Sequence, residues 1–446
     1  MNTPICDFVK KYAELNPSRL HMPGHKGKGL LGFESLDITE VEGADVLYSA
    51  EGIIKESMEN ASSLFDTAKT LYSAEGSSLS IRAMLYLTAM YAKEQNRNPV
   101  ILAGRNAHKA FLSGMALNNM DADWIYPEED EGLLSLKLTP EKLNSYLEKY
   151  EEKPVALYVT SPDYLGNTLD IKALSKVCKE NDMLLLVDNA HGAYLNFLIE
   201  NRHPLALGAT ICCDSAHKTL PVLTGGAYLH LSHKAEKYLS DARDALALHA
   251  TTSPSYITLQ SLDLCTAYLT AHFSEKLYLA TMAIAITQKL LSETGFESAF
   301  NEPLKLTLYP LSYGYTGYEL ADILRKEKIV CEYCDRDHVV LMAPCDNNFC
   351  DIMSVYKAIK SLEKKQAKEP SPRFDLSSEK NVMSLREAIF SPSEYVRTED
   401  AVGRICAEPA VSCPPAVPIC ISGEIITAEI ADAFRYFGFD EIKVIK

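Results

Sequence analysis

The sequence predicts an α/β fold built on a mostly parallel sheet with helices on both faces. Short, continuous apolar runs alternate with segments of helical periodicity, the pattern of parallel strands that are buried on both sides. Polar residues with reactive side chains follow directly on several of these runs, where open α/β sheets bind ligands. With 446 residues, 47% of them hydrophobic and 23% charged, the chain has the composition of an ordinary globular protein.

The elements follow in chain order from apolar runs and from residues spaced three or four apart. A helix is expected over 52–65, and a smaller α/β part begins after a long, broken helical region at 258–294. That part has a strand at 304–309 and a helix at 318–326, and the polar stretch 366–372 indicates a linker. Before this smaller α/β part, strands are expected at 70–73, 100–103, 155–160, 183–187, 209–213 and 226–230. The helices expected between these strands are 79–92, 110–118 and 171–181.

The charge balance excludes some functions. With 44 basic and 60 acidic side chains the net charge is −16, which argues against nucleic-acid binding, where a basic face is expected. An acidic surface suits a cationic substrate, but it also serves solubility alone. The first twenty residues are polar and charged, and no uninterrupted apolar run reaches the ~18 residues of a membrane helix. We therefore expect a cytoplasmic protein without a membrane partner.

Twelve cysteines without a secretory signal indicate reduced thiols. Four of them superficially resemble a zinc site. However, 330–342 is expected to be mostly β structure, in which residues three apart point to opposite faces and do not converge on one ion. We therefore expect no metal ligands here. The four residues are Cys331, Cys334, Cys345 and Cys350.

The segment 214–221, Asp-Ser-Ala-His-Lys-Thr-Leu-Pro, lies between two expected strands and places Lys218 on a loop beside the sheet. Burying an ammonium group is costly unless the group is paired or loses its charge. A lysine that forms a Schiff base loses its charge, which makes Lys218 a candidate anchor for pyridoxal phosphate. The alternative is a solvated lysine in a turn, and the segment by itself leaves both open.

Three other strand ends carry candidate groups. Gly76, Ser77 and Ser78 open a helix and can hold a phosphate, because backbone donors and hydroxyls meet there at the positive end of the helix dipole. His108 can stack on a flat ring, or it is a polar loop residue. Asp188 ends an apolar strand, so it needs a cationic partner such as a protonated pyridine nitrogen, unless it caps a helix.

At this point the chain resembles the ornithine/lysine/arginine decarboxylases, in their shorter form. The similarity rests on 188–193, Asp-Asn-Ala-His-Gly-Ala, together with Ser215-Ala216-His217-Lys218-Thr219-Leu220-Pro221. It covers nearly the whole chain. Further matching motifs are 21–25, 37–40, 105–109, 252–256, 386–388, 401–404 and 423–427.

The resemblance implies a pyridoxal 5'-phosphate enzyme with the aspartate-aminotransferase fold (fold type I) that decarboxylates arginine, lysine or ornithine to a polyamine precursor. It implies that Lys218 forms the internal aldimine, that Asp188 pairs with the pyridine nitrogen and that His108 stacks on the ring. His217, Lys218 or a tyrosine would return a proton to Cα. The implied phosphate ligands are Ser77, Ser78, Ser215 and His217, with His191 close to the cofactor.

The expected domains are an N-terminal arm and helix (1–70), a cofactor-binding large domain (71–275), a small α/β domain (276–365) and a C-terminal family domain (373–446). A homodimer, or a larger assembly of dimers, is expected. Glu424 or Asp45 would hold the distal cation of the substrate. Three alternatives stay open: an aminotransferase that uses Arg404 for the α-carboxylate, an inactive paralogue that acts as a binding protein, and a zinc-binding module around Cys331.

Overall fold

A computed structural model describes residues 1–128, 132–238, 241–271, 273–299, 301–376, 382–408, 412–413 and 417–446. The chain divides into two units. Unit 1 contains residues 1–98, 155–157 and 171–275, and unit 2 contains residues 99–154, 158–170 and 276–446.

The main sheet has seven strands in the order β1-β7-β6-β5-β4-β2-β3. Strand β7 runs antiparallel to both of its neighbours, whereas β5 and β6, and likewise β2 and β3, are parallel. The α/β fold with a mostly parallel sheet is thus confirmed. All six predicted strands form, with ends that differ by at most two residues. The bounds are β1 Lys69–Ser73, β2 Val100–Gly104, β3 Asp121–Ile125, β4 Ala156–Thr160, β5 Leu184–Asp188, β6 Ile211–Asp214 and β7 Ala227–Leu231.

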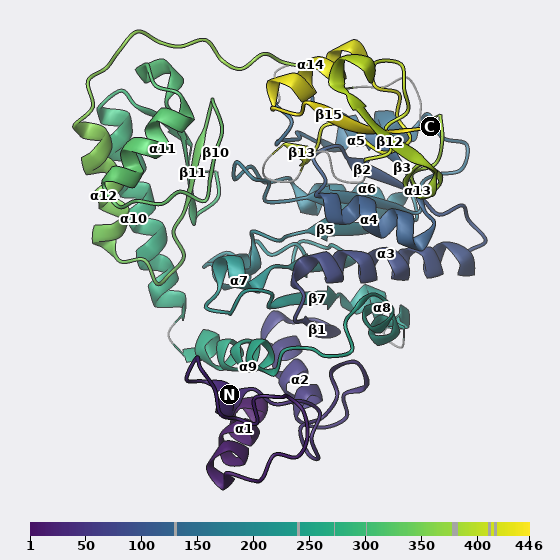
Figure 1. Cartoon of the computed structure of the whole chain (residues 1–446), viewed down its shortest axis with the longest axis vertical. Coiled ribbons are helices and arrows are strands. Elements are labelled where there is room, and N and C mark those ends of the chain that lie inside the picture. Colours follow the sequence, from purple (N-terminus) through teal and green to yellow (C-terminus); the bar gives the residue numbers. More distant parts are fainter. Residues whose placement is uncertain are drawn as a thin grey trace. The chain divides into compact units, whose positions relative to one another are not determined.

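The predicted helices of unit 1 form in the predicted order, and three further helices that were not predicted, α1, α7 and α8, are present as well (Figure 1). The segment around Lys218 was expected to be a loop, but it forms one helical turn, α7. The apolar faces of these helices are buried, as on α6, where Ile171, Leu174 and Val177 are buried. The bounds are α1 Pro4–Leu15, α2 Ile53–Phe65, α3 Gly76–Glu94, α6 Ile171–Glu180, α7 Ala216–Thr219, α8 Ala242–His249 and α9 Tyr256–Ala271.

Unit 2 holds α4 and α5, the smaller α/β part and the C-terminal elements. A four-stranded antiparallel sheet has the order β10-β11-β9-β8, and β12 pairs with β15. Near the C-terminus, Ile430, Phe434 and Val444 belong to one buried apolar cluster. The bounds are α4 Lys109–Asn118, α5 Pro140–Leu147, α10 Phe273–Glu293, β8 Glu297–Ala299, β9 Lys305–Tyr309, α11 Gly317–Lys326, β10 Tyr333–Cys334, β11 Val339–Met342, α12 Phe349–Lys360, α13 Leu385–Phe390, β12 Ser393–Arg397, β13 Ser412–Cys413, β14 Val417–Pro418, α14 Ala428–Tyr436 and β15 Glu441–Ile445.

The segment 330–342 is a hairpin of β10 and β11, not one mostly β segment. Cys331 precedes β10 and Cys334 ends it, so the argument that both lie on one strand was wrong. The polar stretch 366–372 forms neither helix nor strand. Among the described residues no helix is both long and apolar enough to cross a membrane.

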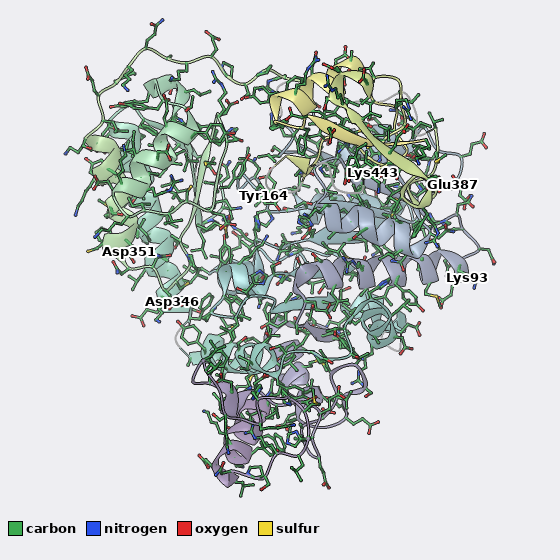
Figure 2. The ribbon with its side chains drawn as sticks, viewed as in Figure 1. Lys93, Tyr164, Asp346, Asp351, Glu387 and Lys443 are labelled. Atoms are coloured by element: carbon green, nitrogen blue, oxygen red, sulfur yellow. The ribbon has the colours of Figure 1, made fainter. Side chains whose placement is uncertain are left out.

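Three helices of unit 2 begin with capping boxes. In a capping box the side chain of the residue before the helix accepts from the backbone N–H three residues later, and the side chain of that later residue accepts from the first residue's N–H. In α12, Asn348 accepts from the N–H of Asp351, whose side chain accepts in return, and Ser384 and Glu387 do the same for α13. Figure 2 labels Asp351 and Glu387 at these helix starts. Thr316 begins α11 in the same way. Side chains at the start of each of these helices therefore satisfy backbone N–H groups that have no partner within the helix.

Candidate active site

The parallel pair β5 and β6 brings Asp188 and Ser215 to the same edge of the sheet. Asp188 is in register with Cys213, and Ser215 directly follows the end of β6. Asp188 is 2% exposed. Its Oδ1 accepts from the N–H of Ala190 at 3.1 Å and from the thiol of Cys213 at 3.6 Å. Burial raises the pKa of the Cys213 thiol well above its usual value, so this thiol keeps the proton that it donates.

The short helix α7 presents Lys218 to His191. Lys218 Nζ lies 2.8 Å from His191 Nε2, and the lysine is only half-buried whereas His191 is buried. His217, one residue earlier, donates through Nδ1 to the carbonyl of Gly226 at 3.0 Å, which leaves Nε2 as its other nitrogen. A lysine amine and two imidazoles therefore lie within one small region of unit 1.

The start of α3 differs from the capped helices of unit 2. No described side chain caps it, and Ser77 Oγ accepts from Ser215 Oγ–H at 2.7 Å. The first N–H groups of a helix have no partner within the helix, so hydroxyls and uncapped donors here form a cup that suits an anion. Gly76 has a φ of +73° and open space within 4 Å of a Cβ position, which leaves room beside the cup.

The segment before β7 closes the base of this cup. The N–H of Gly76 donates to the carbonyl of Gly225 at 2.7 Å. Gly225 has a φ of +93°, and a Cβ there would lie 2.8 Å from the carbonyl oxygen of Ala74, so only glycine fits this close approach.

These groups match the three chemical parts of pyridoxal phosphate. The start of α3 with Ser77 and Ser215 offers donors to a phosphate, and the buried carboxylate of Asp188 suits a protonated ring nitrogen. The half-buried amine of Lys218, 2.8 Å from an imidazole nitrogen of His191, suits an aldehyde. The side chains present therefore fit the cofactor. Ser78 lies in the first turn of α3 beside Ser77.

His108 belongs to unit 2, whereas the residues above belong to unit 1. It is the N-cap of α4, and its Nδ1 accepts from the N–H of Ala110 at 3.0 Å. Its stacking role stays a prediction.

The residues considered for substrate groups have partners within the chain. Both oxygens of Asp45 accept from backbone N–H groups, and these hydrogen bonds lower its pKa although burial opposes them. Glu424 is fully buried, 3.7 Å from Arg105. Arg404 pairs with Glu394 at 2.8 Å. Which residue holds the distal cation stays a prediction.

Asp214 is a buried residue whose importance the sequence analysis did not recognise. Its Oδ2 accepts from Nε2 of His203 at 3.0 Å and from Nε2 of His230 at 3.2 Å, and its Oδ1 accepts from Asn189 at 2.7 Å. Burial alone would raise the pKa of Asp214, but the attraction and hydrogen bonds of the two imidazoles outweigh it and hold this pKa well below its usual range. Its position at the end of an apolar strand, like that of Asp188, was the available signal.

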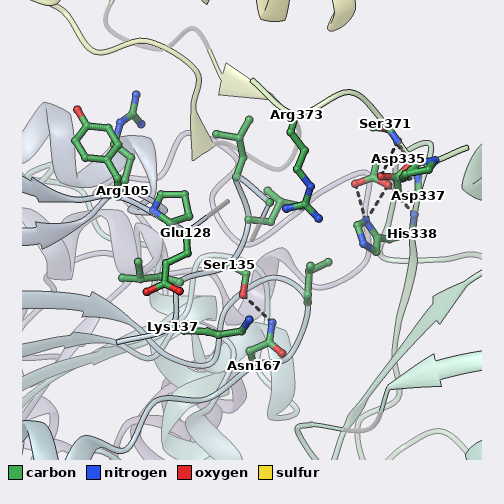
Figure 3. A pocket seen from close by; sticks show the side chains of 18 of the residues that line it. Arg105, Glu128, Ser135, Lys137, Asn167, Asp335, Asp337, His338, Ser371 and Arg373 are labelled. Atoms are coloured by element: carbon green, nitrogen blue, oxygen red, sulfur yellow. Dashed lines mark hydrogen bonds and ion pairs between the residues drawn. The ribbon is translucent and has the colours of Figure 1, made fainter. Parts of the chain in front are cut away.

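A cavity of about 1790 Å³ lies in unit 2, and none of the predicted site residues is among those described as lining it. Some of its polar groups bond to one another. Figure 3 shows Ser135 with Asn167, and Asp335 with His338. The distances are 2.9 Å from Asn167 Nδ2 to Ser135 Oγ and 3.1 Å from His338 Nδ1 to Asp335.

Sequence comparison places the chain in a family. A family model described as "Orn/Lys/Arg decarboxylase, major domain" matches residues 3–303, and "Orn/Lys/Arg decarboxylase, C-terminal domain" matches residues 365–443. A protein of Bacillus subtilis (strain 168), described as uncharacterized protein YaaO, is 30% identical over 96% of this chain and 93% of its own length. The arginine decarboxylase of the same organism is 28% identical over 96% of this chain and 92% of its own.

Solved structures agree on the fold. Lysine decarboxylase A from Pseudomonas aeruginosa superposes with a TM-score of 0.80 at 16% identity, covering 99% of this chain and 80% of that one. The family model covers well over half of the sequence. The chain therefore belongs to the Orn/Lys/Arg decarboxylase family, as an amino-acid decarboxylase that uses pyridoxal 5'-phosphate.

Proposed function

We propose that the chain decarboxylates arginine, which yields agmatine, and that lysine and ornithine are poorer substrates. The observation that carries this proposal is the length of the matches. The relatives that match along more than nine-tenths of both chains and bear an activity in their names are arginine decarboxylases. The match to the lysine decarboxylase LdcA covers 49% of this chain and 31% of that protein.

Lys218 is proposed to bond the cofactor's aldehyde, and His191 to accept the proton of its amine. The 2.8 Å separation of Lys218 Nζ and His191 Nε2 supports this pairing, because a lysine must give up a proton before it acts as a nucleophile. His217 is proposed as a general acid through Nε2 of its imidazolium form, while its Nδ1–H stays bonded to the carbonyl of Gly226. Lys218 is the alternative acid.

Pyridoxal 5'-phosphate, when bound, supplies a conjugated ring that accepts the electrons released at Cα. Asp188 is proposed to keep a proton on the ring nitrogen. Its burial supports this role, because a buried carboxylate is stabilised by a cationic partner. The proposed phosphate ligands are Gly76, Ser77, Ser78, Ser215 and His217, and His108 is proposed to stack on the ring.

A homodimer is proposed as the working assembly. The N-terminal segment exposes three large apolar side chains, Leu20, Leu30 and Leu31, to 96%, 103% and 74%, and their burial against a second copy supports this proposal. A cytoplasmic location stays a prediction.

The test has two parts. The protein is incubated with pyridoxal 5'-phosphate and reduced with borohydride, and peptide mass spectrometry locates the label. We expect the label on Lys218, no label in this peptide in Lys218→Ala, and an unchanged label in the matched control Lys234→Ala, a lysine of the same unit outside the site. Carbon dioxide release is then measured from arginine, lysine and ornithine side by side.

We expect release from arginine to exceed release from the other two at least tenfold, since a site built for a polar group discriminates strongly. A label of wild-type extent in Lys218→Ala would remove the anchor role. Faster release from lysine or ornithine would overturn the substrate, and release from none of the three would overturn the proposed function.

A further inference from the structure

A chain of hydrogen bonds crosses the strands of unit 1 on the face of the sheet opposite to Asp188. Asp188 and Cys213 are in register and in contact at 3.6 Å, so they share one face. Successive residues of a strand point to opposite faces. Asn189 and Asp214, the next residue along in each case, meet on the other face, where Asn189 Nδ2 donates to Asp214 Oδ1 at 2.7 Å.

The same face carries the chain on to β7 and β1. His230 on β7 donates from Nε2 to Asp214 Oδ2, and its Nδ1 lies 2.8 Å from the hydroxyl of Thr70 on β1. His203 supplies the second Nε2–H donor. Asp214, His203 and His230 are all 0% exposed, and the ring of Phe65 lies 4.7 Å from that of His230. The carboxylate of Asp214 on β6 therefore links three neighbouring strands: β5 through Asn189, β7 through His230, and β1 through the contact of His230 with Thr70.

The donor pattern decides between hydrogen bonding and metal binding at this cluster. The ligand atoms of His203, Asp214 and His230 lie within 4.8 Å of one another, which is close enough to hold an ion. However, the N–H of Leu205 donates to His203 Nδ1 at 3.4 Å, so Nδ1 must present its lone pair. The ring proton then resides on Nε2, the atom that would have to bind the metal. The geometry thus fits two imidazoles that donate from Nε2 to one carboxylate, and His203 in this tautomer has no lone pair left on Nε2 for a metal.

We propose that Asp214 is a positioning residue for the cofactor, a role that rests on the proposed function of the site. Its partner Asn189 directly follows Asp188, and Asp214 itself directly precedes Ser215, which is bonded to Ser77. The Asp214 carboxylate fixes the spacing of the ends of β5 and β6. It thereby sets where the Asp188 carboxylate and the phosphate cup lie relative to each other. None of its oxygens needs to touch the cofactor for this.

The test compares Asp214→Asn with a matched control, Asp263→Asn. Asp263 is another buried aspartate of unit 1, and it accepts from the backbone of Ile5 and Cys6 and from Ser57, away from the site. The full-length apo-proteins are titrated with pyridoxal 5'-phosphate by equilibrium dialysis, at a temperature where circular dichroism shows each to be folded. We expect the Kd to rise roughly ten- to a hundredfold in Asp214→Asn, the usual cost of a small misplacement of binding groups. We expect no change in Kd for Asp263→Asn.

A milder variant, Asn189→Ala, removes the hydrogen bond from Asn189 to Asp214 and leaves the two imidazoles in place. This variant tests the positioning role if Asp214→Asn does not fold. Its Kd should rise in the same direction. The positioning role would be overturned if Asn189→Ala, and Asp214→Asn where it folds, had the same Kd as the wild type. A wild type that binds no pyridoxal phosphate would instead overturn the function on which the role rests. One metal ion per wild-type chain, absent from Asp214→Asn in elemental analysis, would replace this inference with a metal site.

Discussion

Two fully buried carboxylates, Asp214 in unit 1 and Glu424 in unit 2, are held in opposite ways. Asp214 accepts three N–H hydrogen bonds at 3.2 Å or less, from two imidazoles and one amide. Glu424 accepts from the N–H of Ile421 at 2.7 Å, but its charged partner Arg105 lies 3.7 Å away. That guanidinium donates instead to the carbonyls of Pro418 and Ile419.

The pKa values of these two carboxylates are shifted in opposite directions. Burial raises the pKa of Glu424, and Arg105 offsets that increase only in part, whereas the donors around Asp214 outweigh burial and lower its pKa. Burial is the same in both sites, so the strength of the attraction from the neighbouring side chains decides whether the charged form is favoured. The guanidinium of Arg105, 3.7 Å away and shared with two carbonyls, lowers the pKa of Glu424 by less than burial raises it, whereas the two imidazoles in hydrogen-bond contact lower the pKa of Asp214 by more.

Removing Arg105 should have the largest effect. Arg105→Ala leaves Glu424 buried without a cation and leaves two carbonyls without a donor, so we expect unit 2 to lose about 3–5 kcal/mol of unfolding free energy. The single tryptophan, Trp124, lies 5.7 Å from the guanidinium and reports the unfolding of this unit in urea by fluorescence. Arg397→Ala is the control, since Arg397 and Glu399 are exposed and should contribute little. Equal urea midpoints for the two variants would contradict a structural role of the buried pair.

The next effect is a loss of stability of unit 1 in acid. Burial lowers the pKa of His230 below its ordinary 6.5, so the unfolded chain binds the proton first and stability falls as the pH falls below 6.5. Asp214, whose pKa is also lowered, adds a further loss as the pH falls below its ordinary 3.8. Amide exchange in β6 and β7, corrected for its intrinsic pH dependence, should show protection falling between pH 7 and pH 5. His230→Gln should remove this upper part of the loss, and an unchanged profile would show that His230 does not titrate on unfolding.

The sequence could predict the sheet and the positions of the candidate groups at the strand ends, because both depend on local patterns. Apolar runs mark β5 and β6; Asp188 directly follows the first run, and Lys218 lies in α7 shortly after the second. The rest depends on contacts between distant residues. Strand β3, Asp121–Ile125, lies at the end of the sheet order and alternates exposed and partly buried residues before the buried Ile125, so it lacks a continuous apolar run. The partners of Asp214 are Asn189, His203 and His230, none of them adjacent in sequence, and no periodicity connects them.

The smallest change in stability should come from Glu424→Gln. The pH dependence of stability that Glu424 causes is opposite in direction to the one that Asp214 causes. Because burial raises the pKa of Glu424 above its ordinary 4.5, its contribution to stability is present below pH 4.5 and is lost as the pH rises through the folded-state pKa. A neutral glutamine keeps the shape and cannot titrate, while Arg105 retains two carbonyl acceptors. The urea midpoint reported by Trp124 should therefore depend less on pH in Glu424→Gln than in the wild type. A loss as large as that of Arg105→Ala, or an unchanged pH dependence, would mean that the carboxylate is ionised at neutral pH and held as tightly as Asp214.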